Sequence, residues 1–225
     1  RICGYCDFFR VADLSHMDEV VMAMHSEMDE QAGFISDKSL QTIYFGGGTP
    51  SLLPPAELQS FIDHAAQIWD CNGVEEITVE VNPDDISEEY IAELKATSVN
   101  RISIGVQSLD DEVLRFMGRR HSAEQAQRAV KMLQEAGYDN ISVDIIFGVE
   151  SATRESLTQT LQGVLDMGVQ HISAYHLTYE EGTRLWHMLE QGLVQPIDEE
   201  QSVRSFELLR EKLLAAGYEH YEISN

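Results

Sequence analysis

Hydrophobic and polar positions alternate along the chain in two kinds of pattern, and these predict strands and helices in alternation. Short apolar runs rich in β-branched residues predict strands at 41–45, 75–81, 100–106, 140–147 and 171–177. Longer stretches with helical spacing predict helices at 16–32, 55–69, 87–97, 122–137, 153–168 and 198–217. The strand segments carry apolar residues on both faces, as expected of a parallel sheet covered by helices.

Start and stop signals agree with these helix boundaries. Pro55 suits a first helical turn, and Ser87 is an N-cap candidate. Ser122 is another, and Gln125 stands three residues later at the spacing of a capping box. Glycines follow three predicted last turns, at Gly137, Gly168 and Gly217. Repeated β-α units of this kind favour either an α/β barrel or a doubly wound sheet.

Glycine and polar residues stand where the predicted apolar strands end, and active sites and ligand sites lie at the carboxyl ends of the strands in such folds. Three glycines and Thr49 follow the first strand in "GGGTP", leaving backbone N–H groups open to a ligand. Glu80, Gln107 and Asp144 are polar residues in or after apolar strands, where an unpaired polar group is costly. Arg119, between two helical segments, can reach an anionic group. These residues predict one pocket for a polar, zwitterionic or nucleoside-like cofactor.

The chain opens "RICGYC", with Cys3 and Cys6 separated by two residues. Such a pair can begin a zinc site, a redox pair or an iron–sulfur cluster. Zinc needs four ligands, and a second cysteine or histidine pair is not evident in the sequence. A redox dithiol is expected after a strand and at the start of a helix, which the surrounding sequence does not favour. Cys71 has no cysteine neighbour and is expected to be a structural or exposed thiol.

The charge balance of 39 acidic and 15 basic residues gives a net charge of -24, which argues against a nucleic-acid surface or an anionic membrane surface. The sequence has no apolar run of membrane-spanning length and no signal-peptide pattern, and its three cysteines do not make a disulfide framework. We therefore expect a cytoplasmic protein. The 225 residues suffice for one α/β domain, and the start at Arg1 suggests a fragment of a longer protein.

Seven motifs in order resemble the radical S-adenosylmethionine (SAM) enzymes, and within them the oxygen-independent coproporphyrinogen III oxidase-like family. They are "CGYCDF", "YFGGGTPSLL", "VEVNPDD", "RISIGVQSLDDEVLRFMGRRHS", "SVDIIFG", "ISAYHLTYEEGT" and "YEISN". The resemblance covers essentially the whole chain. It implies an α/β fold, a partial (β/α)6 TIM-type barrel whose first strand lies outside this chain. It also implies a [4Fe–4S] cluster on three cysteines in the pattern C-x3-C-x2-C, with an open iron that binds SAM. One electron from the cluster cleaves SAM to methionine and a 5′-deoxyadenosyl radical.

Residue by residue, the resemblance implies the following roles. Cys3 and Cys6 match the second and third cluster cysteines, and Tyr5 matches the aromatic position beside the adenine. Gly47, Gly48 and Thr49 match the motif that meets the SAM amino group. The remaining SAM-binding matches are Glu80, Gln107, Arg119, Asp144 and, through its backbone, His176.

The sequence departs from the family pattern in three places. The first cluster cysteine would lie two residues before Arg1, and the family's C-terminal domain would lie beyond the last residue. The loop at 148–153 reads "GVESAT" where the family usually has "GLPGQT", so substrate contacts inferred for that loop are in doubt.

Phe8 bears on the branch of the family. The true oxidases resemble one another in a fourth cysteine at this position, whereas "CDFF" looks like the haem-chaperone branch, whose implied role is to bind haem and deliver it to haemoproteins. The alternatives are an oxidase that decarboxylates coproporphyrinogen propionates oxidatively, and a cluster-free barrel. Both SAM-dependent alternatives imply an electron donor. Any of the eight histidines could ligate haem iron, although no spacing distinguishes one; among them are His121, His171, His176, His187 and His220.

Overall fold

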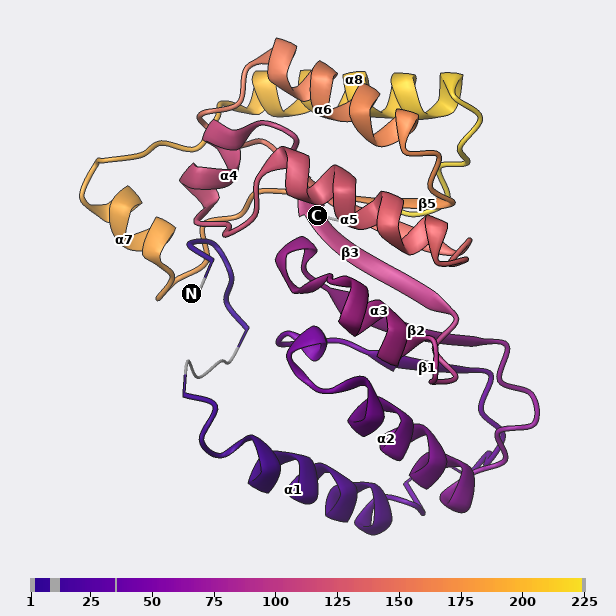
Figure 1. Cartoon of the computed structure of the whole chain (residues 1–225). Coiled ribbons are helices and arrows are strands. Elements are labelled where there is room, and N and C mark those ends of the chain that lie inside the picture. The colour runs from indigo at the N-terminus through magenta and orange to yellow at the C-terminus, as the bar shows by residue number, and fades with distance from the viewer. Residues whose placement is uncertain (1–2, 9–12, 35, 224–225) are drawn as a thin grey trace.

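Five parallel strands form one curved sheet in the computed structural model of the chain, which describes residues 3–8, 13–34 and 36–223. They are β1 (Thr42–Phe45), β2 (Glu76–Val81), β3 (Arg101–Gln107), β4 (Ile141–Phe147) and β5 (His171–His176). Each strand pairs with the strand before it in the chain. A doubly wound sheet reverses its strand order, whereas this sheet winds in one direction only, as a barrel does. The sheet is a half-barrel, and the barrel alternative is the correct one (Figure 1).

Helices lie along the outer face and at one end of the curved sheet, and the first helix packs outside the second (Figure 1). They are α1 (Met17–Glu30), α2 (Pro55–Ile68), α3 (Glu88–Leu94), α4 (Asp111–Met117), α5 (Ala123–Glu135), α6 (Arg154–Asp166), α7 (Arg184–Glu190) and α8 (Glu199–Ala215), with short 3-10 turns η1 (Pro50–Leu52) and η2 (Pro83–Asp85). The six helices expected from the sequence are confirmed to within a few residues. α7 lies outside the expected helical ranges, as does α4, the helical segment before Arg119.

The predicted caps explain where several helices begin. The Ser122 side chain accepts from the Gln125 backbone N–H, and the Gln125 side chain accepts from the Ser122 N–H, so the capping box of α5 is confirmed. Ser87 caps α3 in the same way through the Tyr90 N–H. Pro55 occupies the first turn of α2.

The sheet has one apolar and one polar face. Alternate strand residues such as Ile104 and Val143 are fully buried in the main core, beneath α2, α3, α5, α6 and α8. Their neighbours Ser103, Gly105 and Asp144 face the other way and line the inner side of the curve. The expectation of apolar residues on both faces is therefore wrong, because helices cover only the outer face.

Two short helices build a second, smaller core. Val113, Leu114 and Met117 of α4 pack with Leu185 of α7, and Tyr5 lies against this cluster. The apolar cluster therefore anchors the N-terminal cysteine segment to the sheet end.

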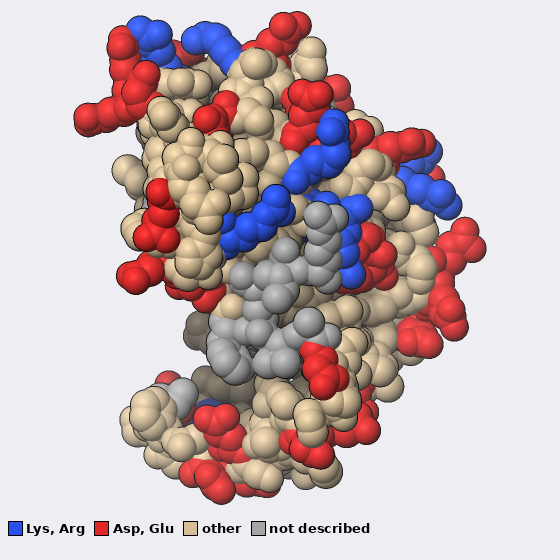
Figure 2. Space-filling view, turned by 90° about the vertical axis from the view of Figure 1, so that its left-hand side faces the viewer, with Lys and Arg blue, Asp and Glu red and all other residues tan. Residues whose placement is uncertain are grey.

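The surface is predominantly acidic, in keeping with the net charge of -24. Figure 2 views the side where the N-terminal segment and α7 lie, and it shows acidic side chains spread widely, with basic side chains mostly in the upper half. Among the described residues, no helix is both long and apolar enough to cross a membrane.

Candidate functional site: a polar cavity at the carboxyl ends of the strands

A cavity of about 540 Å³ lies at the carboxyl ends of the strands, on the inner face of the sheet. The structure brings together there every residue that the sequence predicted for cofactor binding: Tyr5, Gly47, Gly48, Thr49, Glu80, Gln107, Arg119, Asp144 and His176. Cys6 also lines it, and Cys3 lies beside it, within reach of Arg119. Their roles in binding stay predictions, but their convergence from seven segments is a property of the fold.

The glycine-rich turn connects β1 to the η1 turn. Gly47 has a φ of +99°, a backbone conformation that side-chain-bearing residues rarely adopt. A Cβ atom at Gly48 would meet only open space, so the backbone there faces the cavity directly. The turn therefore offers accessible backbone groups to a ligand.

Two carboxylates on the inner face, from β2 and β4 on either side of β3, differ in environment. Glu80 accepts a hydrogen bond of 2.8 Å from the Tyr44 hydroxyl, which makes it a paired group. Burial raises the pKa of Asp144 from 3.8 to about 6, and the charge of Glu80 adds to the rise, while a hydrogen bond from Ser173 opposes it. Burial and Glu80 also raise the pKa of Tyr44, which keeps its hydroxyl protonated. The pair can therefore accept hydrogen bonds, and Asp144 can hold a proton near neutral pH.

Gln107 ends β3 in a strained turn. Its φ is +66°, the one positive φ outside glycine among the described residues, and the Ser108 N–H donates to the Val106 carbonyl at 2.8 Å. This is a γ-turn of the rare type, which costs roughly 1–3 kcal/mol and is typical of functional sites. The turn directs the amide of Gln107 back over Gly105.

Arg119 joins three parts of the site. One of its terminal nitrogens donates to the Asn82 side-chain oxygen at 2.8 Å and to the Gly105 carbonyl at 2.7 Å. The other donates to the Cys3 sulfur at 3.4 Å. Gly105 permits this approach, because a Cβ atom there would lie 3.2 Å from the guanidinium and 2.8 Å from the Gln107 amide nitrogen. The Nε of Arg119 is buried and has no partner among the described residues, so it can still donate to an anionic ligand.

The cysteine segment is clamped through its backbone. The Gly4 N–H donates to the Met117 carbonyl at the end of α4, and the Gly4 carbonyl accepts from the Leu185 N–H in α7, both at 2.8 Å. Burial raises the pKa of Tyr5, although the nearby Arg119 opposes the rise. The two thiols are therefore presented at a fixed edge of the cavity, and all three cysteines of the chain are free thiols.

The histidines divide by environment. His121 is buried and donates from Nε2 to the Val106 carbonyl at 3.0 Å, and burial together with Arg119 lowers its pKa to about 4. It is therefore neutral at physiological pH and holds the strained end of β3. His176 stands edge-on to Phe147, with a ring-centroid distance of 5.2 Å. Its Nε2 is buried and has no hydrogen-bond partner among the described residues.

Sequence reasoning missed several residues that line the cavity: Asp7, Asn82, Ser103, Gly105, Tyr175 and Glu180. The signal for two of them was present, because Ser103 and Gly105 alternate with Ile102 and Ile104 along β3. Four carboxylates, those of Asp7, Glu80, Asp144 and Glu180, line the cavity against one guanidinium. The lining therefore suits a ligand that carries positive charge and one anionic group.

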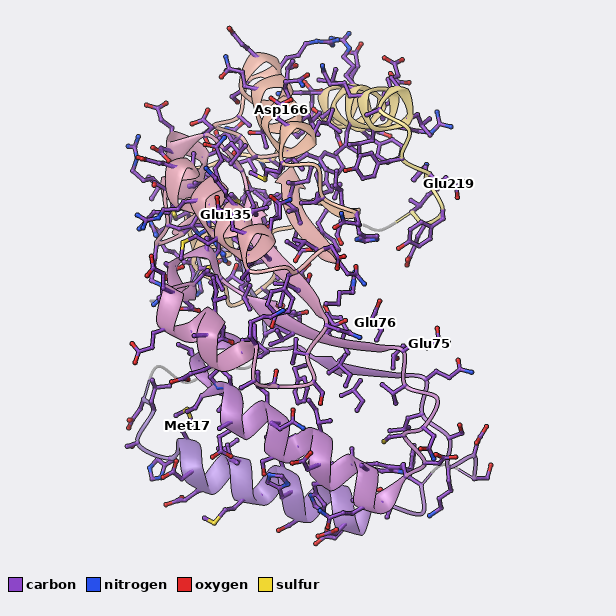
Figure 3. All side chains as sticks on the ribbon, turned by 45° about the vertical axis from the view of Figure 1, so that its right-hand side comes forward. Met17, Glu75, Glu76, Glu135, Asp166 and Glu219 are labelled. Atoms are coloured by element: carbon purple, nitrogen blue, oxygen red, sulfur yellow. The ribbon has the colours of Figure 1, made fainter. Side chains whose placement is uncertain are left out.

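A second polar cluster lies at the amino ends of the strands. Arg101 contacts Glu76 at 3.6 Å, while His171 bonds to the Ser142 hydroxyl and the Tyr221 hydroxyl, each at 2.7 Å. Figure 3 shows Glu76 on the opposite side of the molecule from Met17, at the start of α1. The members of this second cluster satisfy one another's hydrogen bonds, so the cluster is a structural feature of the sheet. Both ring nitrogens of His171 are used within it.

A family model described as the Radical SAM superfamily matches residues 1–163. The chain belongs to the radical SAM superfamily. Among curated proteins, this radical SAM chain is 35% identical over 225 residues to "Heme chaperone HemW" of Lactococcus lactis, covering 100% of the chain and 59% of that relative. It is 33% identical to HemW of Bacillus subtilis, covering 100% of the chain and 60% of the relative. A bovine mitochondrial protein named for its radical SAM domain is 32% identical, with 99% and 51% covered.

The radical SAM fold is also evident from solved structures. The coproporphyrinogen III oxidase HemN of Escherichia coli superposes with a TM-score of 0.85 at 22% identity, covering 100% of this chain and 52% of that chain. This likeness confirms the expected partial TIM-type barrel. The chain spans about 59% of the length of the HemW relative from Lactococcus lactis.

Proposed function

We propose that this radical SAM chain is the cofactor-binding core of a haem chaperone that carries a [4Fe–4S] cluster and SAM. One observation carries the proposal: the residues that match the family's SAM-binding positions all line the same cavity, and Cys6 opens into it. Relatives named HemW at 31–35% identity support the chaperone branch.

The chemistry of the cavity fits SAM, which carries a sulfonium, an ammonium and a carboxylate group. Carboxylates predominate in the lining, which favours the two cationic groups. The buried, unpartnered Nε of Arg119 supplies a donor for the carboxylate. Glu80, Asp144 and Gln107 offer acceptors for ribose hydroxyls and amino groups.

The thiols fit an iron–sulfur cluster. Cys3 and Cys6 are free, and thiolates are the ligands that such clusters prefer. Among the described residues no group of three metal-ligating side chains stands together, and the proposal takes its third cysteine from upstream, as the family pattern implies. When bound, the cluster supplies the single electron for reductive cleavage of SAM. The protein's own residues bind and orient SAM and hold it beside the thiols.

The second candidate is an oxygen-independent coproporphyrinogen III oxidase. The fold shared with HemN supports it, but fold alone does not determine chemistry. Phe8, at the position of the oxidases' fourth cysteine, favours the chaperone. On either proposal the partners are haem or a porphyrin and an electron donor. The chaperone adds recipient haemoproteins, and a cytoplasmic location suits its free thiols.

One experiment separates the two candidates. The full-length protein is reconstituted anaerobically with iron and sulfide, supplied with SAM, a reductant and coproporphyrinogen III, and assayed in parallel for haem binding. We expect haem binding without decarboxylation. Formation of protoporphyrinogen would instead establish the oxidase, and the lack of any cluster would contradict both candidates.

A further inference from the structure

Asn82 occupies a position between the SAM pocket and the cysteine segment that the family resemblance does not assign. It follows β2, and its side-chain oxygen accepts from Arg119 at 2.8 Å. The same guanidinium donates to the Cys3 sulfur at 3.4 Å. Arg119 thus connects the amide of Asn82 to Cys3, a predicted cluster ligand.

Asp85 fixes the orientation of the Asn82 amide. Its nitrogen donates to Asp85 at 3.4 Å, so its oxygen must face Arg119. Asp85 is itself held, because it accepts from the Ser51 hydroxyl at 2.7 Å and from Arg120 at 3.3 Å. Asp85 therefore aligns Asn82, and Asn82 aligns Arg119.

Arg119 needs this support to reach the sulfur. Its guanidinium is planar, so acceptors at Asn82 and Gly105 that hold one terminal nitrogen also set the direction of the other. That second nitrogen points at Cys3. If Asn82 no longer accepted, the guanidinium could rotate about its stem toward solvent or toward the cavity.

We propose that Asn82 is a positioning residue that holds Arg119 against the Cys3 sulfur, and that this hydrogen bond raises the reduction potential of the cluster. The inference rests on the proposed function. Reduction adds one electron, whose negative charge spreads onto the ligating sulfurs. A cationic donor beside one of those sulfurs stabilises the reduced state, and hydrogen bonds to sulfur are a principal determinant of cluster potential.

The test is a potentiometric titration of the reconstituted full-length protein, followed by the electron paramagnetic resonance (EPR) signal of the reduced cluster. Asn82→Ala is expected to shift the reduction equilibrium about tenfold toward the oxidised cluster, a potential lower by about 59 mV for one electron. Arg119→Lys keeps the charge but loses the planar fork, and a shift of at least about threefold in the same direction is expected. It tests the same contact if Asn82→Ala does not fold.

Two controls separate positioning from general loosening. Ser87→Ala removes the N-cap of α3, on the same connection after β2, but leaves the hydrogen bonds of Asn82, Asp85 and Arg119 in place, so the melting temperature should fall while the potential stays within about threefold of wild type, about 30 mV. Arg115→Gln removes an exposed cation that pairs with Glu112 and should leave the potential unchanged. The proposal is overturned if Asn82→Ala leaves the potential within threefold of wild type, or if Ser87→Ala shifts it equally. A wild-type protein without any cluster would contradict the proposed function as well.

Discussion

Replacing Asp144 by asparagine should stabilise the cluster-free protein at neutral pH. Asp144 lies in β4 between Val143 and Ile145, both almost completely buried. Burial raises its pKa from 3.8 to about 6. The difference of roughly two pKa units corresponds to about 3 kcal/mol between the folded and unfolded states.

The sign and the pH window follow from the direction of the shift. The folded state binds the proton more tightly than the unfolded state does, so lowering the pH through about 6 toward 3.8 removes the penalty that the ionised carboxylate imposes. Above pH 6 the penalty is fully present. The asparagine side chain in the Asp144→Asn variant would be neutral throughout, so the stabilisation should be about 2–3 kcal/mol at pH 7.5 and much smaller at pH 4.5.

Urea unfolding of the cluster-free protein, followed by circular dichroism at both pH values, measures this difference. Asp139→Asn, the same substitution at an exposed position, should change the free energy of unfolding by less than about 0.5 kcal/mol. Asp144→Asn should also weaken SAM binding to the reconstituted protein at least about tenfold, as expected for a charged hydrogen bond. A loss of stability at pH 7.5 would refute the reasoning, because it would make Asp144 a structural hydrogen-bonding residue.

Three further substitutions test β3 and the histidine that contacts its end. Gly105→Ala should destabilise the protein by about 1–3 kcal/mol and weaken SAM binding, because the added Cβ would crowd Arg119 and the Gln107 amide. Urea unfolding measures the loss of stability, and a binding titration measures the loss of affinity. An unchanged SAM affinity would contradict the close approach of Arg119 to Gly105. Gln107→Gly should raise the free energy of unfolding by about 1 kcal/mol by relieving the positive φ while SAM affinity falls, and a large destabilisation would show that the turn is not strained. His121→Gln should remove one source of acid sensitivity. Burial and Arg119 hold the pKa of His121 near 4, so the contribution of this histidine to stability is lost as the pH falls from 6.5 to 4, opposite in sign to that of Asp144. An identical pH profile of unfolding in the variant would count against this origin.

The helices and strands were predictable because their signals are local. The capping box at Ser122, Pro55 at a first turn and the β-branched runs all act within one element. The direction of winding was not predictable from those signals, since it depends on pairings between segments far apart in the chain. The polar inner face was misjudged for a related reason: an open curve needs helices on one side only, and Ser103 and Gly105 then become cavity residues.

The candidate site was predictable where polar residues contradict their strands, as Asp144 and Glu80 do. The γ-turn at Gln107 left no sequence signal, because glutamine is not a residue that favours a positive φ. Asn82 was hidden for another reason. An asparagine before a proline reads as an ordinary turn, and only the folded chain brings its oxygen within 2.8 Å of Arg119. The link from Arg119 to Cys3, across 116 positions of sequence, likewise exists only in three dimensions.

The central claim is that the cavity binds SAM next to a cluster ligated by Cys3 and Cys6. The most direct measurement is the EPR spectrum of the dithionite-reduced, reconstituted full-length protein before and after addition of SAM. We predict a [4Fe–4S] signal whose g-values change when SAM binds in wild type, with this change lost or strongly weakened when Glu80 and Asp144 are both replaced by alanine. A cluster signal that SAM leaves unaltered in wild type would contradict the claim.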